Sequence, residues 1–324
     1  MNAMKQTKIT LRKGLAILLL AAVIATGIVV ALRNNSPASQ DRLTVSATYY
    51  PLYEFAKQVG GNKIRVINMT PAGSEPHDYE PAARALADAQ QTDVFIYNGG
   101  RFEPWTDGFL RDYTNTAVRA SDGIGLTKIH HDDHPEDKDA DEHGHDNRDG
   151  QDPHFWLDPI HAQQIVANIR DGLIRADPQH KAHYTERATA YSAALQQLDT
   201  DFRSGLANCE QDAIITAHQA FGYMAQRYGF TMEAIAGLSP EEEPSAARLA
   251  ELSDMVTSEG IRYVFFESLV SPRLADTIAQ ETGAETLVLN PIEGLSNEDQ
   301  KQGKDYLSVQ RENLANLRAA LACR

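Results

Sequence analysis

The sequence contains few cysteines and few basic residues for its length. Its 324 residues include two cysteines, too few for a zinc cluster held by cysteines or for a small protein built on disulfides. Thirty basic against 45 acidic side chains give a formal net charge of −15, whereas a general nucleic-acid-binding protein needs a basic surface. The remaining composition, 42% hydrophobic and 23% charged, indicates a globular protein of about two domains.

One long hydrophobic run lies near the N-terminus. Four basic side chains between positions 5 and 13 precede 18 uncharged residues, Leu15–Leu32. A basic flank followed by an apolar run is typical of an export signal, and this run is also just long enough to span a membrane. We therefore expect residues 1–41 to be a signal or membrane anchor with a linker, and everything from about residue 42 to lie outside the cytoplasm. Cleavage at Ser36-Pro37-Ala38 and an uncleaved anchor both stay open, and a lipoprotein anchor is not expected because no cysteine lies near the run.

Segments rich in β-branched or aromatic residues are predicted to be strands. They are Leu43–Tyr50, Lys63–Thr70, Asp93–Asn98 and Thr116–Ser121 in the first half, and Ala213–Ala217, Phe230–Ala236, Tyr263–Glu267 and Thr286–Asn290 in the second. Helical patterns between them include Leu52–Val59, Ala83–Gln91, Phe221–Tyr228, Ala246–Ser258 and Arg273–Thr282. This alternation predicts an α/β fold with two doubly wound, parallel-sheet lobes.

A stretch without strand signals separates the two groups. Pro159–Ala176 is predicted to be one helix, and Asp177-Pro178 then resembles an N-cap followed by proline in the first turn of a second helix. Nothing breaks this second helix until Gly205, so it would span about 45 Å. The expected parts are an N-terminal lobe at 42–176, a connecting helix at 177–207 and a C-terminal lobe at 208–324.

Residues 128–150 form a low-complexity segment within the expected first lobe. The segment contains nine acidic and three basic side chains, and almost no apolar ones, so we expect a mobile loop. A run of charges alone would indicate only a solvated surface. Five histidines within these 23 residues favour auxiliary metal capture instead; they are His130, His131, His134, His143 and His145.

Three other histidines stand where parallel α/β sheets bind their ligands, beyond the carboxyl ends of strands. His77 lies in the turn after the second predicted strand, His154 in a loop just before a helix, and His218 directly after the strand at 213–217. A single histidine in such a place is more often an ordinary polar residue. Three in equivalent places, beside a histidine-rich loop, predict a metal site in the cleft between the lobes.

The fourth position of such a site needs an acid or a water molecule. A carboxylate would offset part of the charge of a divalent cation and complete a tetrahedron. Glu293, which follows the last predicted strand, is the best-placed candidate, and Glu75, Glu267 and water are the alternatives.

The sequence resembles the solute-binding proteins of zinc and manganese ABC transporters over about residues 42–322. The stretches that carry the resemblance are SATYYPLYEFAKQVGG, GSEPHDYEP, VFIYNGGRFEPW, DPHFWLDP, ITAHQAFGYMAQRYGF, VFFESLVSPRLADTIAQETG and LNPIEG. It implies two α/β lobes joined by one long rigid helix, with a metal held between them and delivered to a membrane permease. The three histidines of the family fall on His77, His154 and His218. Asn290 stands where some members have an aspartate ligand, which favours Glu293, and an acidic histidine-rich insertion is typical of the zinc-uptake branch.

The expected cargo is Zn²⁺ rather than Mn²⁺, because three imidazoles and one carboxylate suit zinc while manganese prefers oxygen donors. We expect a monomer that is not an enzyme. The alternatives are a secreted zinc hydrolase, for which the chain has no HExxH helix and no evident Ser-His-Asp arrangement, and a metal-binding adhesin of the same family. In an oxidising exterior, Cys209 and Cys323 are expected to pair and tie down the C-terminal helix.

Overall fold

The computed structural model describes residues 42–99, 102–127 and 151–324, and residues 43–324 belong to one compact unit. The expected signal or anchor segment and the histidine-rich loop lie outside the described residues. Strands and helices alternate along the described part of the chain, as expected for an α/β protein. No helix among these residues is both long and apolar enough to cross a membrane.

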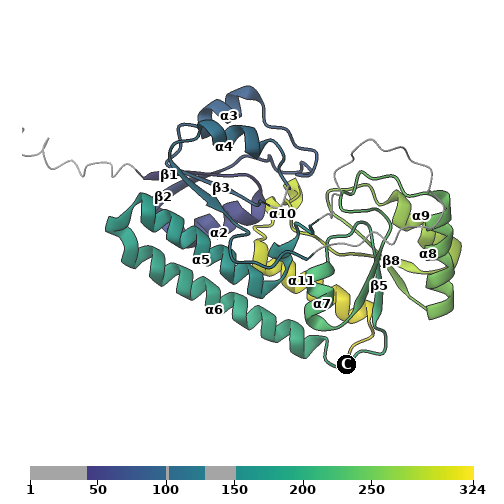
Figure 1. Ribbon diagram of the computed structural model, residues 1–324. Coiled ribbons are helices and arrows are strands. Elements are labelled where there is room, and N and C mark those ends of the chain that lie inside the picture. Colours follow the sequence, from purple (N-terminus) through teal and green to yellow (C-terminus); the bar gives the residue numbers. More distant parts are fainter. Residues whose placement is uncertain (1–41, 100–101, 128–150) are drawn as a thin grey trace, which may run out of the picture. The chain divides into compact units, whose positions relative to one another are not determined.

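The first sheet contains four parallel strands in the order β2-β1-β3-β4. They are β1 (Leu43–Ala47), β2 (Ile64–Asn68), β3 (Val94–Tyr97) and β4 (Thr116–Arg119). Helices α2 (Tyr50–Gly60) and α5 (Pro159–Ala176) cover one face, and α3 (Ala83–Ala89) and α4 (Thr106–Asp112) cover the other (Figure 1). Strand β3 is wholly apolar because it is buried on both faces: Val94 and Ile96 join the core on the α2 side, and Phe95 and Tyr97 the core on the α4 side.

The second sheet repeats this topology in the order β6-β5-β7-β8, again with parallel strands. Its strands are β5 (Ala213–Thr216), β6 (Thr231–Ala234), β7 (Tyr263–Phe266) and β8 (Glu285–Val288). Helices α8 (Ala246–Glu259) and α9 (Arg273–Thr282) pack on one face through Leu252 and Ile278, which meet Ile215 and Val264. The opposite face, with Ile214 and Phe265, joins the main core of the molecule.

This main core is shared by both halves of the chain. It receives side chains from α2, α5, α6 (Lys181–Gly205), α7 (Gly222–Tyr228) and α11 (Tyr306–Ala320), and α11 follows the short helix α10 (Asn297–Lys301). Figure 1 shows α6 running beside α5 from the side of the first sheet to the side of the second. From α11, the hydroxyl of Tyr306 donates to the Trp156 carbonyl at 2.5 Å, and Gln310 Nε2 donates to the Leu157 carbonyl at 3.0 Å.

The predicted fold class is confirmed, and several element ends differ from the expectation. The first strand ends at Ala47 rather than Tyr50, because Tyr50-Pro51 already begins α2 with proline in the first helical turn. The long helix begins at Lys181, after a single turn of 3-10 helix at Pro178–His180. Asp177 does not cap it as expected, because its carboxylate accepts hydrogen bonds from the His180 ring and the Tyr184 hydroxyl. The lobe limits at 176 and 208 stay a prediction.

Cys209 and Cys323 are joined in a disulfide across 114 residues of sequence. The bond ties the chain just after α11 to the segment between α6 and β5. In the chain-entropy model, closing a loop of this length stabilises the fold by up to about 4–5 kcal/mol. We expect the free energy of unfolding of the double variant Cys209→Ala, Cys323→Ala, measured in urea, to be lower than that of the wild type by up to this amount. Dithiothreitol should lower the free energy of unfolding of the wild type by the same amount and leave that of the variant unchanged. A wild-type free energy of unfolding that dithiothreitol does not change would contradict this expectation.

Candidate metal centre

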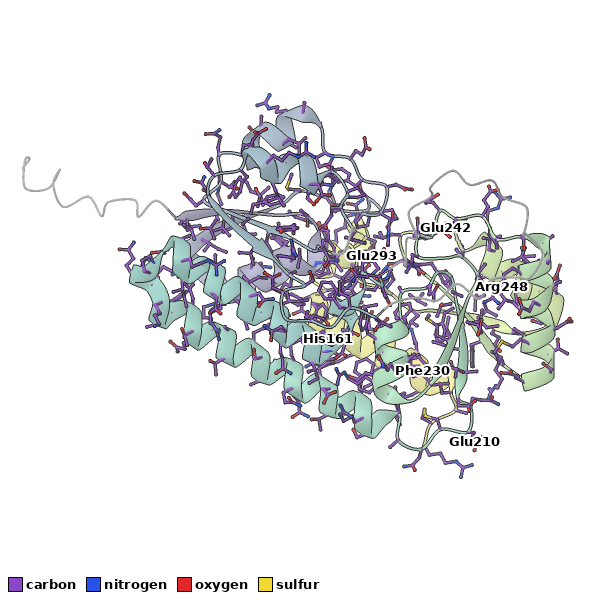
Figure 2. The ribbon with its side chains drawn as sticks, in the orientation of Figure 1. His161, Glu210, Phe230, Glu242, Arg248 and Glu293 are labelled. Carbon is purple, nitrogen blue, oxygen red and sulfur yellow. A yellow bond between two sulfur atoms is a disulfide. The ribbon has the colours of Figure 1, made fainter. Side chains whose placement is uncertain are left out.

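Four loops bring His77, His154, His218 and Glu293 together. His77 follows β2, His218 lies two residues after β5, and Glu293 follows β8. His154 stands immediately before the 3-10 turn Phe155–Leu157 that leads into α5. In each sheet the chain order reverses beside the first strand, and ligands of such sheets bind beyond the carboxyl ends at that point. Figure 2 shows Glu293 in the middle of the molecule, between the parts that contain the two sheets.

The ligand atoms of these four side chains converge closely. The Nε2 atom of His154 lies 3.1 Å from His77 Nε2 and 3.2 Å from His218 Nε2. Glu293 Oε1 lies 3.2 Å from the Nε2 atoms of His77 and His154 and 3.3 Å from that of His218. All four atoms lie within 4.8 Å of one another. Ligands bound tetrahedrally to zinc at about 2.0–2.1 Å are about 3.3–3.4 Å apart, so five of the six separations approach that geometry.

Two buried carboxylates fix the orientation of two of the imidazoles. Asp152 Oδ1 accepts from His154 Nδ1 at 2.8 Å, and Glu267 Oε1 accepts from His218 Nδ1 at 2.6 Å. Each carboxylate also accepts the backbone N–H of the same histidine. Because Nδ1 donates in these bonds, each ring in its neutral form has the Nε2 lone pair directed at the centre of the group. Neutral Nε2 atoms 3.2 Å apart repel each other unless a cation or proton lies between them.

The site is buried, and burial competes with the nearby charges. Burial lowers the pKa of His77, against the opposing effect of Glu293. Burial also acts to lower the pKa of His154 and of His218. For His154, hydrogen bonds to Asp152 and Glu293 outweigh burial and raise the pKa. For His218, the charge of Glu267 outweighs burial and raises the pKa well above its usual value. Burial would raise the pKa of Glu293, but the three imidazoles outweigh it and hold that pKa well below its usual value. Glu293 is therefore a carboxylate, able to neutralise half the charge of a divalent cation.

The other two candidate acids take different places. Glu267 faces His218 Nδ1, on the side of the ring away from the converging atoms. Glu75 lies next to Glu293 and accepts from the Asp78 N–H at 3.2 Å. Burial and the charge of Glu293 raise the pKa of Glu75 to about 8, so Glu75 is largely protonated at neutral pH. Among the described residues, Glu293 is the acid that the structure places in the converging group.

Several residues that hold the ligands in place were not predicted from the sequence. Asp152 is one of them, and its spacing two residues before His154 was the available signal. Phe102 is another: its ring meets the His77 ring edge-on at 4.7 Å between centroids. Asn98, immediately after β3, donates from Nδ2 to the Pro153 carbonyl at 3.0 Å and accepts from the Tyr49 hydroxyl at 2.7 Å. The loop after β3 thus supports both His77 and the peptide before His154.

Glu103 anchors this supporting loop. Its Oε1 accepts the Thr48 hydroxyl at 2.5 Å and the Asn98 N–H at 3.0 Å, while Oε2 makes no hydrogen bond within the described residues. Burial raises the pKa of Glu103 from 4.5 to about 7 despite these donors. Between about pH 4.5 and pH 7, the Glu103 carboxyl therefore keeps a proton in the folded protein that it loses in the unfolded chain. The free energy of unfolding consequently falls as the pH rises through this range.

We expect Glu103→Gln to remove this pH dependence. The amide is neutral at every pH and keeps one oxygen to accept from Thr48 and Asn98. Relative to the variant, the wild-type free energy of unfolding should fall by up to about 3 kcal/mol between pH 5 and pH 8. Urea unfolding at the two pH values measures the difference. Parallel changes in both proteins would show that Glu103 does not titrate in this range.

Comparison with known proteins places the chain in a family. Residues 45–320 match the sequence profile of the family described as zinc-uptake complex component A, periplasmic (ZnuA). The chain belongs to this family. It is 40% identical over 302 residues to the zinc-binding lipoprotein AdcA of Streptococcus pneumoniae R6, covering 93% of this chain and 60% of that protein. It is 38% identical over 292 residues to the high-affinity zinc uptake system protein ZnuA of Bacillus subtilis, covering 89% of this chain and 91% of that protein.

Solved structures show the same fold. The Zn(II)-bound ZnuA-like domain of S. pneumoniae AdcA matches with a TM-score of 0.73 at 38% identity, over 86% of this chain and 99% of that one. The laminin-binding protein Lmb of Streptococcus agalactiae, described as a bifunctional adhesin and metal transporter, matches with a TM-score of 0.75 at 29% identity, with the same coverage. The chain spans about three fifths of the length of the AdcA protein of S. pneumoniae.

Proposed function

We propose that this protein is an extracytoplasmic solute-binding protein that captures zinc and delivers it to an ABC transporter permease. The observation that carries the proposal is the convergence of three imidazole nitrogens and one ionised carboxylate on one buried point. His77, His154, His218 and Glu293 are the proposed ligands. The zinc-binding and zinc-uptake names of the AdcA and ZnuA relatives support the same cargo.

The donor set favours binding over catalysis. A catalytic zinc ion keeps one position open for water or substrate, whereas four protein ligands close a tetrahedral site. The proposed site therefore holds its cargo without activating a water molecule. We further propose that the protein acts as a monomer, with the lobes and connecting helix divided as expected from the sequence. Residues 1–41 would direct it out of the cytoplasm, as a cleaved signal or as an anchor.

The histidine-rich loop is proposed to capture additional zinc weakly. Its five histidines lie outside the described residues, so the proposal rests on their sequence alone. Nine acidic against three basic side chains would attract cations to this part of the molecule. We expect zinc titration of the full chain to show one tight equivalent and further weak ones, and only the weak ones should disappear when 128–150 is deleted.

Residues that orient the ligands provide the test of the proposed site. We expect Asp152→Asn and Glu267→Gln each to weaken zinc binding by about 10–100-fold, because the imidazoles lose their fixed orientation and some basicity. A competition titration with a chromogenic zinc chelator measures the change. Asp158→Asn is the matched control: Asp158 is buried in the same loop, but it caps α5 and pairs with Arg227 at 2.5 Å. Unchanged affinity in both test variants would contradict the assigned ligands.

An adhesin role is the second candidate, and the likeness to Lmb favours it. That protein is described as both an adhesin and a metal transporter, so the two roles are compatible in one fold. Binding of the zinc-loaded full chain to immobilised laminin tests this candidate directly. Saturable binding that albumin does not compete for would support it, and the absence of such binding would leave zinc delivery as the sole proposed role.

A further inference from the structure

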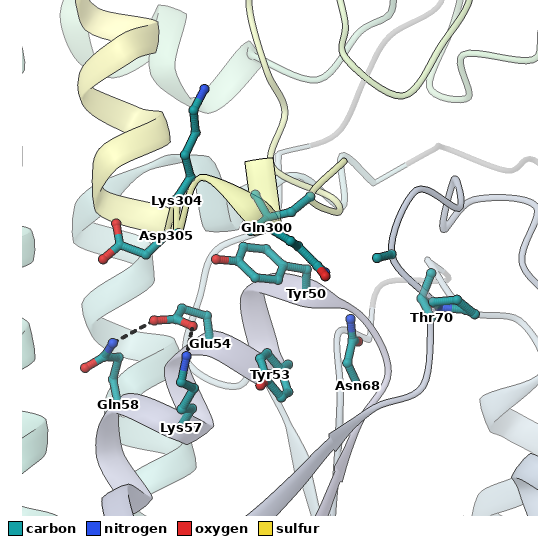
Figure 3. A pocket seen from close by; sticks show the side chains of 14 residues that line it. Tyr50, Tyr53, Glu54, Lys57, Gln58, Asn68, Thr70, Gln300, Lys304 and Asp305 are labelled. Atoms are coloured by element: carbon teal, nitrogen blue, oxygen red, sulfur yellow. Dashed lines mark hydrogen bonds and ion pairs between the residues drawn. The ribbon is translucent and has the colours of Figure 1, made fainter. Parts of the chain in front are cut away.

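A cavity lies outside the group of the four proposed zinc ligands. Its volume is about 670 Å³, within the range of small-molecule sites. One wall is α2, another is the end of β2 with the residues that follow it, and the third is the segment from Leu295 to Asp305 (Figure 3). None of His77, His154, His218 and Glu293 lines it.

Among the described residues that line this cavity, carboxylates outnumber free cations. Glu54 is 2% exposed and accepts from Gln58 Nε2 at 2.6 Å, and Asp305 caps the first turn of α11. Lys304 lines the cavity too, but its ammonium lies 3.0 Å from Asp299 and 2.8 Å from Glu312, so two carboxylates already neutralise it. Lys57, which is half exposed and 3.4 Å from Glu54, is left as the counter-charge to Glu54 and Asp305.

The cavity also contains a buried hydroxyl, that of Tyr50. Tyr50 is 5% exposed, and its hydroxyl has no hydrogen-bond partner among the described residues. Burial and the charges of Glu54 and Asp305 raise the pKa of Tyr50, against a smaller lowering from the nearby Tyr306 N–H, which does not reach hydrogen-bond geometry. Figure 3 shows the hydroxyl end of Tyr50 turned toward the side chains of Glu54 and Asp305. Asn68, another lining residue, has a buried Oδ1 that accepts no hydrogen bond from the part of the chain that the structure describes.

Aromatic rings complete the lining. The Tyr50 and Tyr53 rings lie 6.4 Å apart between centroids at an angle of 35°. The ammonium of Lys57 already stands 5.8 Å from the centroid of the Tyr53 ring, so this wall accepts a positive charge on its face. The cavity thus offers acceptors and π faces, a set that suits a group with only N–H donors and a positive charge.

We propose that this cavity binds an organic cation, an ammonium or guanidinium group on a small carbon body. Its N–H groups would donate to Glu54, Asp305 and the Tyr50 hydroxyl, and its charge would balance the excess carboxylate. The same group exists in free amines and in the lysine and arginine side chains of a polypeptide.

The position of the cavity connects it to the proposed zinc site. Ala72, in its lining, lies five residues before His77, and Leu295 lies two residues after Glu293. The N–H of Gly73 donates to the Leu295 carbonyl at 3.1 Å, so the two ligand-bearing loops are joined at the edge of the cavity. A bound cation therefore changes zinc affinity, and zinc changes the affinity for the cation by the same factor. This coupling rests on the proposed function, whereas cation binding itself does not.

Calorimetric titration of the metal-free full chain tests the proposal, with agmatine as the free amine and acetyl-Gly-Arg-Gly-amide as the polypeptide form. We expect Glu54→Gln to weaken binding of the preferred probe by about tenfold or more, because a charge-assisted hydrogen bond is lost. Tyr50→Phe should weaken it less. Asp305→Asn keeps a capping side chain and provides a second test if Glu54→Gln does not fold. Glu298→Gln is the matched control, since Glu298 is exposed on α10 and does not line the cavity.

Stronger binding of agmatine would identify a free amine as the ligand, and stronger binding of the peptide would identify a polypeptide side chain. Binding of neither probe at millimolar concentration would overturn the proposal, as would binding that Glu54→Gln and Asp305→Asn leave unchanged. Repeating the titration on zinc-loaded protein tests the coupling alone. A protein that binds agmatine but no zinc would contradict the proposed function and leave the cation site standing.

Discussion

Replacing His154 or His218 by alanine is expected to weaken zinc binding by more than the roughly 10–100-fold that an orienting partner contributes. Each imidazole supplies one of four bonds to the metal, and its loss also leaves Asp152 or Glu267 as a buried carboxylate without its histidine. His77→Ala should have a similar effect on affinity. Competition titration against a zinc chelator measures all three variants.

Two controls separate the proposed site from other histidines. His183→Ala removes an imidazole that bonds the Gly60 carbonyl far from the four ligands, and should leave zinc affinity unchanged. Deletion of 128–150 should remove weak equivalents and keep the tight one. If the loop deletion and the ligand variants lost equal affinity, the primary site would lie in the loop.

The tight site is expected to select zinc strongly over manganese. Imidazole is a good ligand for zinc, while manganese prefers oxygen donors and higher coordination than four side chains supply. The general affinity order of divalent metals adds to this preference, since nitrogen and oxygen sites hold zinc more tightly than manganese. We therefore expect a roughly hundredfold excess of manganese to leave the tight equivalent of zinc in place.

The measurement is elemental analysis after dialysis of zinc-loaded protein against manganese. Glu293→Ala provides a further comparison, because it removes the one oxygen ligand and should weaken manganese binding at least as much as zinc binding. Displacement of zinc by manganese at comparable concentrations would contradict the proposed cargo. Copper and nickel are outside this comparison, because they bind such donors tightly in vitro.

The strands were predictable because burial dominates their composition. β3 is wholly apolar and β5 is apolar except for Thr216, and both are buried along their whole length, as expected for parallel strands covered on both faces. The candidate site followed from the same topology: His77 and His218 stand at the carboxyl ends of strands, where chains of this architecture bind ligands. Positions in the sequence therefore indicated the three histidines, and also Glu293 as the best-placed fourth candidate, before any geometry was known.

The remaining parts of the site depend on contacts between distant segments. Glu267 lies 49 residues from His218, and nothing in its local sequence distinguishes an acid that binds Nδ1 from one that binds metal. The packing of the strands determines which role Glu267 has, because the end of β7 lies beside the end of β5 and so brings Glu267 to His218 Nδ1. The same holds for α11, whose Tyr306 and Gln310 bond the carbonyls of Trp156 and Leu157 about 150 residues away.

Zinc-edge X-ray absorption of the full chain lacking 128–150, loaded with one equivalent of zinc, tests the central claim most directly. We expect four nitrogen or oxygen ligands at about 2.0–2.1 Å, with outer-sphere scattering from three imidazoles. The imidazole scattering should fall to two rings in His77→Ala, where any zinc still bound retains His154 and His218. Six oxygen ligands, or scattering from fewer than three imidazoles in the protein with all its ligands, would contradict the assignment of His77, His154, His218 and Glu293.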